Sequence, residues 1–273
     1  MQPKPLSEET SVLTLRRIEV GQSPVLLMSR ASFSWGGFRL FDGQDFGNDD
    51  MVSAPVGPLL ARDPSIRACA EMAPGTIRSR AAAGAEWVVG WHPNGTYVRE
   101  LVGRLDTKKS LEQSATWVQL SFLGGAVVPL LVDAYDAARL GEGRTAILFY
   151  LISYGRTNPE VRALAERALA DRSRMARRRA CEVLAYGLDP ASIPALEAAS
   201  RASQDDETRQ NISLAIKAIR TQNHNAMHPG VNWIVRPEDE VRAKATNGPP
   251  TEAPGREGAL TRIARAVTAR RKG

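Results

Sequence analysis

The spacing of apolar residues is most regular between Asn158 and Gly187, where it predicts two helices joined by a short polar turn. In the first helix, apolar residues follow the i, i+3, i+4, i+7, i+8 spacing of an amphipathic helix. These residues are Val161, Leu164, Ala165, Ala168 and Leu169. The second helix carries Ala180, Val183 and Leu184 together with a run of arginines. Because neither helix can bury its apolar stripe alone, we expect each to pack against neighbouring helices.

A repeat of about 32 residues extends this pattern along the chain. Arg144, Arg177 and Arg209 are 33 and 32 residues apart, and an apolar helix follows each of them. A fainter copy covers residues 114–125, before the first of these arginines. Three or four helical hairpins of equal length are too regular for a simple bundle, so we expect a stacked array.

Residue types that favour the start or the end of a helix occur at the positions that this repeat predicts. Asn158-Pro159 and Asp189-Pro190 each place a capping side chain before a proline, which is favoured at the first helical position. The acidic run 205–207 suits a helix start, where the helix dipole stabilises negative charge. Gly155 and Gly187 are expected to end their helices.

The segment 126–221 resembles HEAT-repeat proteins on three features. They are a proline in the first helix of a hairpin, an Asp-Pro or Asn-Pro helix start, and an R-x-x-A-x-x-x-L pattern in the second helix. Arg177, Ala180 and Leu184 carry that pattern. The resemblance implies an all-α fold, a right-handed solenoid of antiparallel helical hairpins. It implies an architecture and no particular activity.

Residues 1–60 predict the least about structure, and residues 31–50 show no helical period. Segments 13–20 and 23–29 are short apolar runs that suit strands. The stretch 31–50 is rich in Gly, Asp and aromatic residues, which is typical of an ordered irregular loop or of short strands packed on a neighbour. We interpret this region as a cap over the open end of the helical array, with a ligand-binding or partner-binding loop as the alternative.

The segment that follows is expected to be helical. Residues 57–72 suit one or two helices interrupted by a proline, and residues 76–90 suit a third. Asn94-Gly95 lies between two apolar runs and is a hairpin signal, which would make both runs strands. We prefer a new helix from Thr96, because the downstream pattern is helical.

The expected organisation has four parts. They are an irregular N-terminal cap (1–56), a HEAT-like helical repeat domain (57–221), a terminal cap segment (222–236) and a flexible basic tail (237–273). The tail is assigned from its Pro, Gly, Glu and Thr content, which cannot bury a core.

Composition and charge support a globular protein without narrowing its function. Apolar residues make up 43% of the chain and charged residues 24%, as in soluble globular proteins. The net charge is +6, and residues 256–273 carry six basic and one acidic residue. Cys69 and Cys181 form no metal spacing and suit two free thiols in a reducing compartment. With no signal peptide and no membrane-length apolar run, we expect a cytoplasmic protein.

Few residues suggest catalysis or metal binding. His224 and His228 are four apart, but Pro229 argues against the helix that a paired zinc site would need. Asp133 and Asp136 could act as an acid pair, although such a pair is more often a solvated helix face. We therefore expect no catalytic residue, no metal and no cofactor, and a protein that is not an enzyme.

The arginines near the second helix of segment 158–187 are the candidate partner-binding site. They are Arg172, Arg174, Arg177, Arg178 and Arg179. One interpretation is a structural ladder, in which they bond carbonyls and acids of the next repeat. The alternative is an anion-binding edge for an acidic protein or for nucleic acid. Repetition explains Arg177 but not the other four.

These features favour a non-enzymatic scaffold or adaptor that binds a protein partner, since stacked hairpins present an extended surface. An inhibitor or immunity-type binder is one form of this hypothesis. The alternative is a DNA- or RNA-binding protein that uses the arginine edge and the basic tail. Aromatic residues do not alternate with the arginines, so base stacking has little support. No membrane association is expected.

Overall fold

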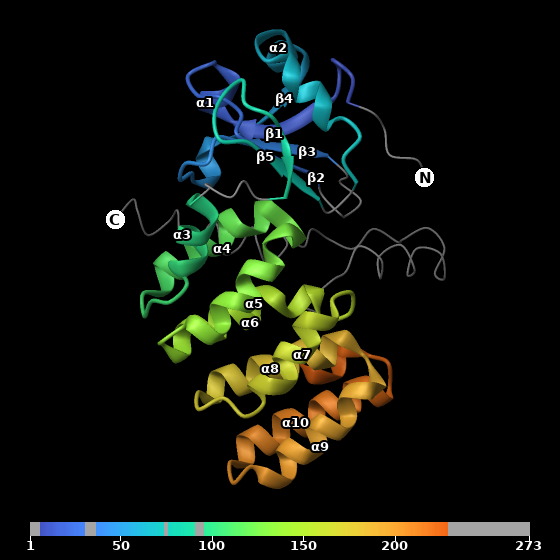
Figure 1. Ribbon diagram of the computed structural model, residues 1–273. Helices are drawn as coiled ribbons and strands as arrows, with labels where there is room; N and C mark the ends of the chain where they lie inside the picture. The colour runs from blue at the N-terminus through green and yellow to red at the C-terminus, as the bar shows by residue number, and fades with distance from the viewer. Residues whose placement is uncertain (1–5, 31–36, 74–75, 91–95, 229–273) are drawn as a thin grey trace, which may run out of the picture. The chain divides into compact units, whose positions relative to one another are not determined.

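The structure, a computed structural model, contains a β-sheet followed by helices (Figure 1). It describes residues 6–30, 37–73, 76–90 and 96–228. The chain divides into two compact units, residues 1–150 and 151–273. Each unit is described by itself.

The first unit contains a six-stranded mixed sheet with strand order β4-β1-β3-β2-β5-β6. The strands are β1 (Ser11–Leu15), β2 (Leu27–Arg30), β3 (Phe38–Phe41), β4 (Met51–Pro55), β5 (Ile77–Ser79) and β6 (Val88–Val89). β1 and β3 are parallel, and the other neighbouring strands are antiparallel. The expectation of an all-α solenoid is therefore wrong. The short apolar runs of the first 60 residues contribute paired strands instead of an irregular cap, although the run 13–20 is a strand only to Leu15 and continues as a short helix.

The helix expected over residues 76–90 is also wrong, because this segment forms β5 and β6. Its alanines favour a helix, but Gly84 and Gly90 adopt φ values of 78° and 87°, which no right-handed helix allows. Ile77 is buried opposite Ser29 of β2. Burial in the sheet thus outweighs the helix propensity of the alanines.

The remaining elements of the first unit are mostly short helices. They are α1 (Arg16–Glu19), η1 (Asn48–Asp50), α2 (Gly57–Arg62), η2 (Pro64–Cys69), α3 (Tyr97–Gly103), α4 (Ser110–Leu123), η3 (Gly124–Val127), α5 (Val128–Ala137) and α6 (Gly141–Leu151). α2 and η2 confirm the interrupted helix of 57–72, and α3 confirms the helix after Thr96. The hairpin signal Asn94-Gly95 lies outside the described residues.

Within the described residues, no single helix is both apolar and long enough to cross a membrane. The helix pair Ser110–Ser121 and Gly124–Ala137, bent by 120°, has sufficient length and apolar composition only when taken together.

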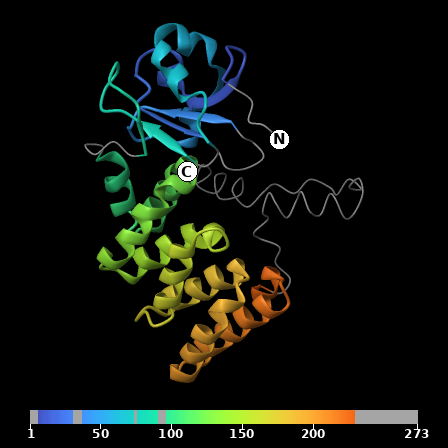
Figure 2. The same cartoon turned by 45° about the vertical axis from the view of Figure 1, so that its right-hand side comes forward.

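The second unit consists of helical hairpins (Figure 2). Its elements are η4 (Ile152–Tyr154), α7 (Pro159–Ala168), α8 (Arg174–Gly187), η5 (Pro190–Ser192), α9 (Ile193–Ala202), α10 (Asp206–Arg220) and η6 (His224–Met227). α8 packs against both α7 and α10, and α9 packs against α10. The two helices predicted between Asn158 and Gly187 are confirmed. The expected cap residues 229–236 and the tail 237–273 lie outside the described residues.

Local chemistry explains where these helices begin and how closely they pack. The Asn158 side chain accepts hydrogen bonds from the backbone N–H of Glu160 (2.9 Å) and Val161 (3.3 Å), which caps α7. A Cβ atom at Gly155 would lie 2.5 Å from the carbonyl oxygen of Val183. Glycine is required there because α8 approaches this backbone closely. Gly187 is the last residue of α8, as expected.

Candidate functional site

Four arginines occupy the same position in four helices. Each is the fourth residue of its helix, and each donates from Nη1 to the carbonyl six residues earlier. The bonds run from Arg144 to Ala138 (3.0 Å), Arg162 to Arg156 (3.0 Å), Arg177 to Asp171 (2.9 Å) and Arg209 to Ser203 (2.8 Å). These arginines close the turn that precedes their own helix. The spacing of Arg144, Arg177 and Arg209 therefore has a local structural basis, and Arg162 makes the same contact at the start of α7.

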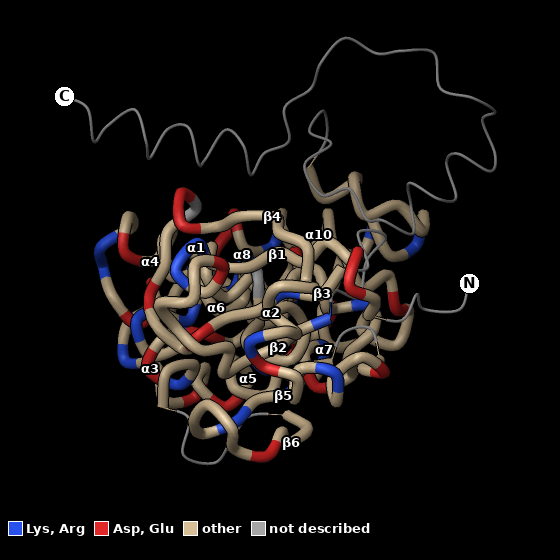
Figure 3. Tube along the Cα trace, turned by 90° about the horizontal axis from the view of Figure 1, so that it is seen from above, with Lys and Arg blue, Asp and Glu red and all other residues tan. Residues whose placement is uncertain are grey.

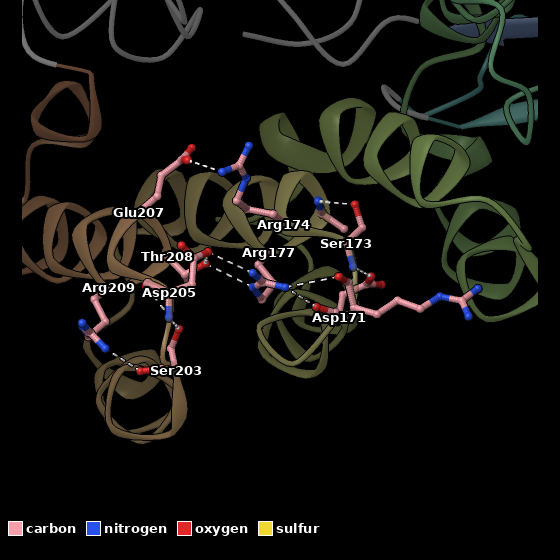
Figure 4. A network of polar contacts seen from close by, with 11 residues as sticks. Asp171, Ser173, Arg174, Arg177, Ser203, Asp205, Glu207, Thr208 and Arg209 are labelled. Carbon is pink, nitrogen blue, oxygen red and sulfur yellow. Dashed lines mark hydrogen bonds and ion pairs between the residues drawn. The ribbon is translucent and has the colours of Figure 1, made fainter.

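Arg177 also ties two helical hairpins together (Figure 4). Its Nη2 lies 3.0 Å from Asp205 Oδ2, and its Nε donates to Thr208 Oγ1 at 3.1 Å. Thr208 and Arg177 both bond to Asp205, and they lower the pKa of that carboxyl. All three nitrogens of Arg177 are engaged in structural contacts. Each nitrogen therefore already has an acceptor within the protein.

The arginines around Arg177 lie in different environments. Arg172 is exposed in the turn before α8. Arg174, the first residue of α8, is exposed, and its Nη1 lies 2.9 Å from Glu207 Oε2 of α10 (Figure 4). Arg178 and Arg179 both contact Glu182. The structure thus separates Arg172 and Arg174, which are exposed, from Arg177, Arg178 and Arg179, which are partly buried.

Glu182 is the charged centre of this part of α8. Its side chain is 1% exposed. Oε1 lies 3.2 Å from Arg178 Nε and 3.3 Å from His228 Nε2, and Oε2 pairs with Arg179. Burial opposes ionisation of Glu182, but His228 and Arg179 outweigh it and lower the pKa of the carboxyl. Glu182 is therefore a charged carboxylate at neutral pH.

The segment after α10 covers the C-terminal half of α8. His224 of η6 packs edge-on against Tyr186, with ring centroids 5.1 Å apart. Met227 is buried, and His228 contacts Glu182. The two histidines thus hold this segment against α8. Within the described residues, no group of three or more His, Cys, Asp or Glu side chains could hold a metal ion.

One face of α8 therefore changes from exposed to buried along its length. Arg174, Arg178 and Glu182 follow at four-residue spacing, so they lie on one stripe of the helix. Arg174 and the adjacent Met175 are exposed, Arg178 is partly exposed, and Glu182 is buried. We name the exposed part, Arg172, Arg174, Met175 and Arg178, the α8 surface. Sequence reasoning identified its arginines but missed Met175 and Glu182.

The other candidate residues do not come together at a site. Asp133 and Asp136 are exposed on α5, which agrees with a solvated helix face. His224 and His228 serve as packing and charge neighbours of α8. His92 lies outside the described residues.

A second buried charge network lies in the first unit, around Arg80. Its Nε donates to the Val25 carbonyl (2.8 Å), its Nη1 to Ser65 Oγ (2.8 Å), and its Nη2 pairs with Asp63. The guanidinium also lies 4.5 Å from the centre of the Trp87 ring. This arrangement ties the residues between α2 and η2 to the strands β5 and β6.

Comparisons with known proteins do not assign the chain to a family. No family model matches it, and neither the curated proteins nor the solved structures contain a match. Its function therefore has to be inferred from its own residues.

Proposed function

We propose that the protein is a non-enzymatic binding module that docks an acidic surface of a protein partner on the α8 surface. The observation that carries this proposal is the exposure of Met175, a residue that is 40% exposed. Among the described residues of the second unit, it is the one exposed large hydrophobic side chain. It lies beside Arg174 and within one helical turn of Arg178.

This combination of residue types favours a protein partner. Arginine and methionine are both enriched at protein interfaces, where an apolar anchor fills a pocket and arginines bind carboxylates. A guanidinium binds a carboxylate through two parallel hydrogen bonds, which fixes orientation as well as affinity. Arg178 uses only Nε within the described part of the chain, where no contact involves its two terminal amino groups. They are placed to bind a carboxylate of the partner.

Two features argue against nucleic acid as the main partner. Basic and acidic positions are interspersed along the described trace (Figure 3), whereas nucleic-acid binding uses a continuous basic strip. Glu207 lies against Arg174 on this surface. The aromatic side chain of the same helix face, Tyr186, is buried against His224 and cannot stack on a base.

A catalytic role for the buried carboxylate is disfavoured by its partners. A general acid or base works best with a pKa near the working pH. His228 and Arg179 hold the pKa of Glu182 below its ordinary value instead, against the opposing effect of burial. We therefore assign Glu182 to the organisation of the surface and not to proton transfer.

Site-specific crosslinking in cells that produce the protein tests the proposal. A photo-crosslinking amino acid replaces Met175 on the α8 surface or, as a control, Arg201, which is exposed on α9. We expect a protein adduct at position 175 that is absent at position 201 and is lost when Arg174→Glu and Arg178→Glu are added. The paired changes Arg201→Glu and Arg220→Glu alter charge equally and should leave the adduct intact. Absence of an adduct at 175, equal adducts at both positions, or adducts sensitive to nuclease would overturn the proposal.

A defined probe tests the chemistry of the partner. It is a fluorescein-labelled helical peptide with Glu and Asp residues flanking a leucine stripe, compared with a labelled DNA duplex. We expect the peptide to bind wild-type protein and to lose binding with Arg174→Glu plus Arg178→Glu. Tighter binding of the duplex than of the peptide would support the nucleic-acid alternative and contradict the proposal.

A further inference from the structure

We infer that Glu182 is a positioning residue, which holds Arg178 so that its two terminal amino groups bind one carboxylate of the partner. This inference rests on the proposed function and adds the residue that gives the α8 surface its specificity. It makes the arrangement of charges, and not their number, the basis of recognition.

The first step is the contact between the two side chains. Glu182 Oε1 lies 3.2 Å from Arg178 Nε, one helical turn away on α8. The glutamate side chain is 1% exposed, whereas that of Arg178 is 37% exposed. The carboxylate therefore lies beneath the guanidinium and binds it from the protein side.

The second step is the geometry of the guanidinium group. This group is planar, and a hydrogen bond at Nε limits its rotation. With Nε engaged, the edge formed by Nη1 and Nη2 remains for a second carboxylate, and its two N–H groups match the two oxygens. No hydrogen bond or ion pair with a described residue involves this edge. A ligand with a planar carboxylate fits it better than a point charge does.

The third step is the support that Glu182 itself receives. Arg179 pairs with Oε2, and His228 lies 3.3 Å from Oε1. The carboxylate is thus fixed from two further sides, beneath the segment that follows α10. Loss of any one neighbour would still leave it paired.

Arg174 provides a contrast on the same surface. Its partner, Glu207, comes from another helix and is itself partly exposed. Exposed ion pairs of this kind hold a side chain weakly. Arg174 therefore contributes charge, whereas Arg178 contributes a fixed orientation. Fixing a side chain before binding reduces the entropy lost on association.

The experiment measures the dissociation constant of the labelled acidic peptide for wild type, Glu182→Gln and Glu197→Gln. Glu197 is the matched control, because it pairs with Arg220 at 3.1 Å, away from the α8 surface. We expect Glu182→Gln to weaken binding about tenfold, although it makes the surface more positive. Glu197→Gln should leave binding unchanged or slightly tighter. Simple charge attraction predicts tighter binding for both variants, so binding by Glu182→Gln that equals or exceeds wild type overturns the inference.

A second pair of variants guards against misfolding of Glu182→Gln. Arg178→Lys keeps the charge but lacks the planar fork, and should weaken binding about tenfold. Arg201→Lys makes the same kind of change at an exposed position of α9, outside the α8 surface, and should leave binding unchanged. Combining Glu182→Gln with Arg178→Lys should weaken binding no further than Arg178→Lys alone, since both act through one contact. Wild-type affinity in Arg178→Lys, or additive losses in the combination, contradict the positioning role.

The outcomes separate the two proposals. If wild-type protein does not bind the peptide, the proposed function fails. If wild type binds and the double Arg→Glu variant does not, the function stands. Unchanged binding by Glu182→Gln and Arg178→Lys would then refute only the role of Glu182.

Discussion

Each unit contains an ion pair with one buried member, but the buried member is a cation in the first unit and an anion in the second. In the first unit the cation is enclosed, because the Arg80 side chain is 0% exposed and all three of its nitrogens are engaged. In the second unit the anion Glu182 is enclosed, and the arginines around it extend toward the surface. Because the buried member cannot contact other molecules, only the charge of its outer partner remains available to them.

The difference separates a structural network from a binding surface. Asp63, the outer member of the first pair, accepts a hydrogen bond from Ser65 and pairs with Arg80, so both of its oxygens are used. Burial opposes ionisation of Asp63, but the bonds from Arg80 and Ser65 outweigh it and lower the pKa. Arg178, the outer member of the second pair, keeps two amino groups that form no hydrogen bond or ion pair with a described residue. Charge burial alone therefore does not identify a site, whereas unengaged donors beside a buried partner do.

Replacing the enclosed cation should have the largest effect on stability. Arg80→Met leaves Asp63 without its main partner and should cost about 3 kcal/mol of unfolding free energy. Urea unfolding measures this cost, and binding of the acidic peptide to the folded fraction should be unchanged. A cost below that of Arg178→Met would contradict the structural role assigned to Arg80.

Acid titration should reveal the enclosed anion. The pKa of Glu182 lies below its ordinary value of 4.5, so the folded state binds fewer protons than the unfolded state as the pH falls. Its stabilising contribution is complete above the unfolded pKa and is lost as the pH falls through the folded pKa. Wild-type protein should lose more stability than Glu182→Gln between about pH 5 and pH 3. Glu197→Gln is the control, and urea midpoints at each pH provide the measurement; parallel curves for wild type and Glu182→Gln would contradict the assignment.

The two cysteines can report on the two networks separately. Cys69 and Cys181 are both buried and free, and burial raises their thiol pKa values to about 11 and about 12. Both should resist alkylation in the folded protein, because the reactive thiolate is scarce and inaccessible. Pulsed alkylation with mass spectrometry should show faster labelling of Cys69 in Arg80→Met and of Cys181 in Glu182→Gln. Equal acceleration of both thiols in either variant would mean that the networks do not stabilise their own regions.

The smallest stability effect is expected at the α8 surface. Arg178→Met removes the partly exposed member of the ion pair with Glu182 and should change the unfolding free energy by less than about 1 kcal/mol. The same change should abolish most of the binding to the acidic peptide. A large loss of stability with intact binding would mean that Arg178 has a structural role like that of Arg80, and would contradict its assignment to a binding surface.

The helical half of this fold was predictable because its signals are local. The caps at Asn158 and Ser173 and the apolar stripe of α7 can be read within one or two turns of chain. The sheet was not predictable in this way. Its strands are two to five residues long, and β1 pairs with β3 although β2 lies between them in the sequence. Such pairings depend on distant segments that no local period records.

The binding surface was predictable only in part. The sequence located the arginine cluster, and the spacing of Arg178 and Glu182 is that of a helical ion pair. That spacing could have singled out Glu182. Its burial depends on His228, which lies 46 residues further along the chain and folds back onto α8. Local sequence therefore could not divide the arginines into structural and exposed groups.

Hydrogen exchange at the arginine side chains tests the central claim most directly, because it needs no partner. Nuclear magnetic resonance of the Nε–Hε groups should show the slowest exchange at Arg80, slow exchange at Arg178 and fast exchange at Arg174. Glu182→Gln should accelerate exchange at Arg178 to the rate of Arg174 and leave Arg80 unchanged. Exchange at Arg178 as fast as at Arg174 in the wild type, or unaltered by Glu182→Gln, would contradict the account of a buried carboxylate that orients a surface arginine.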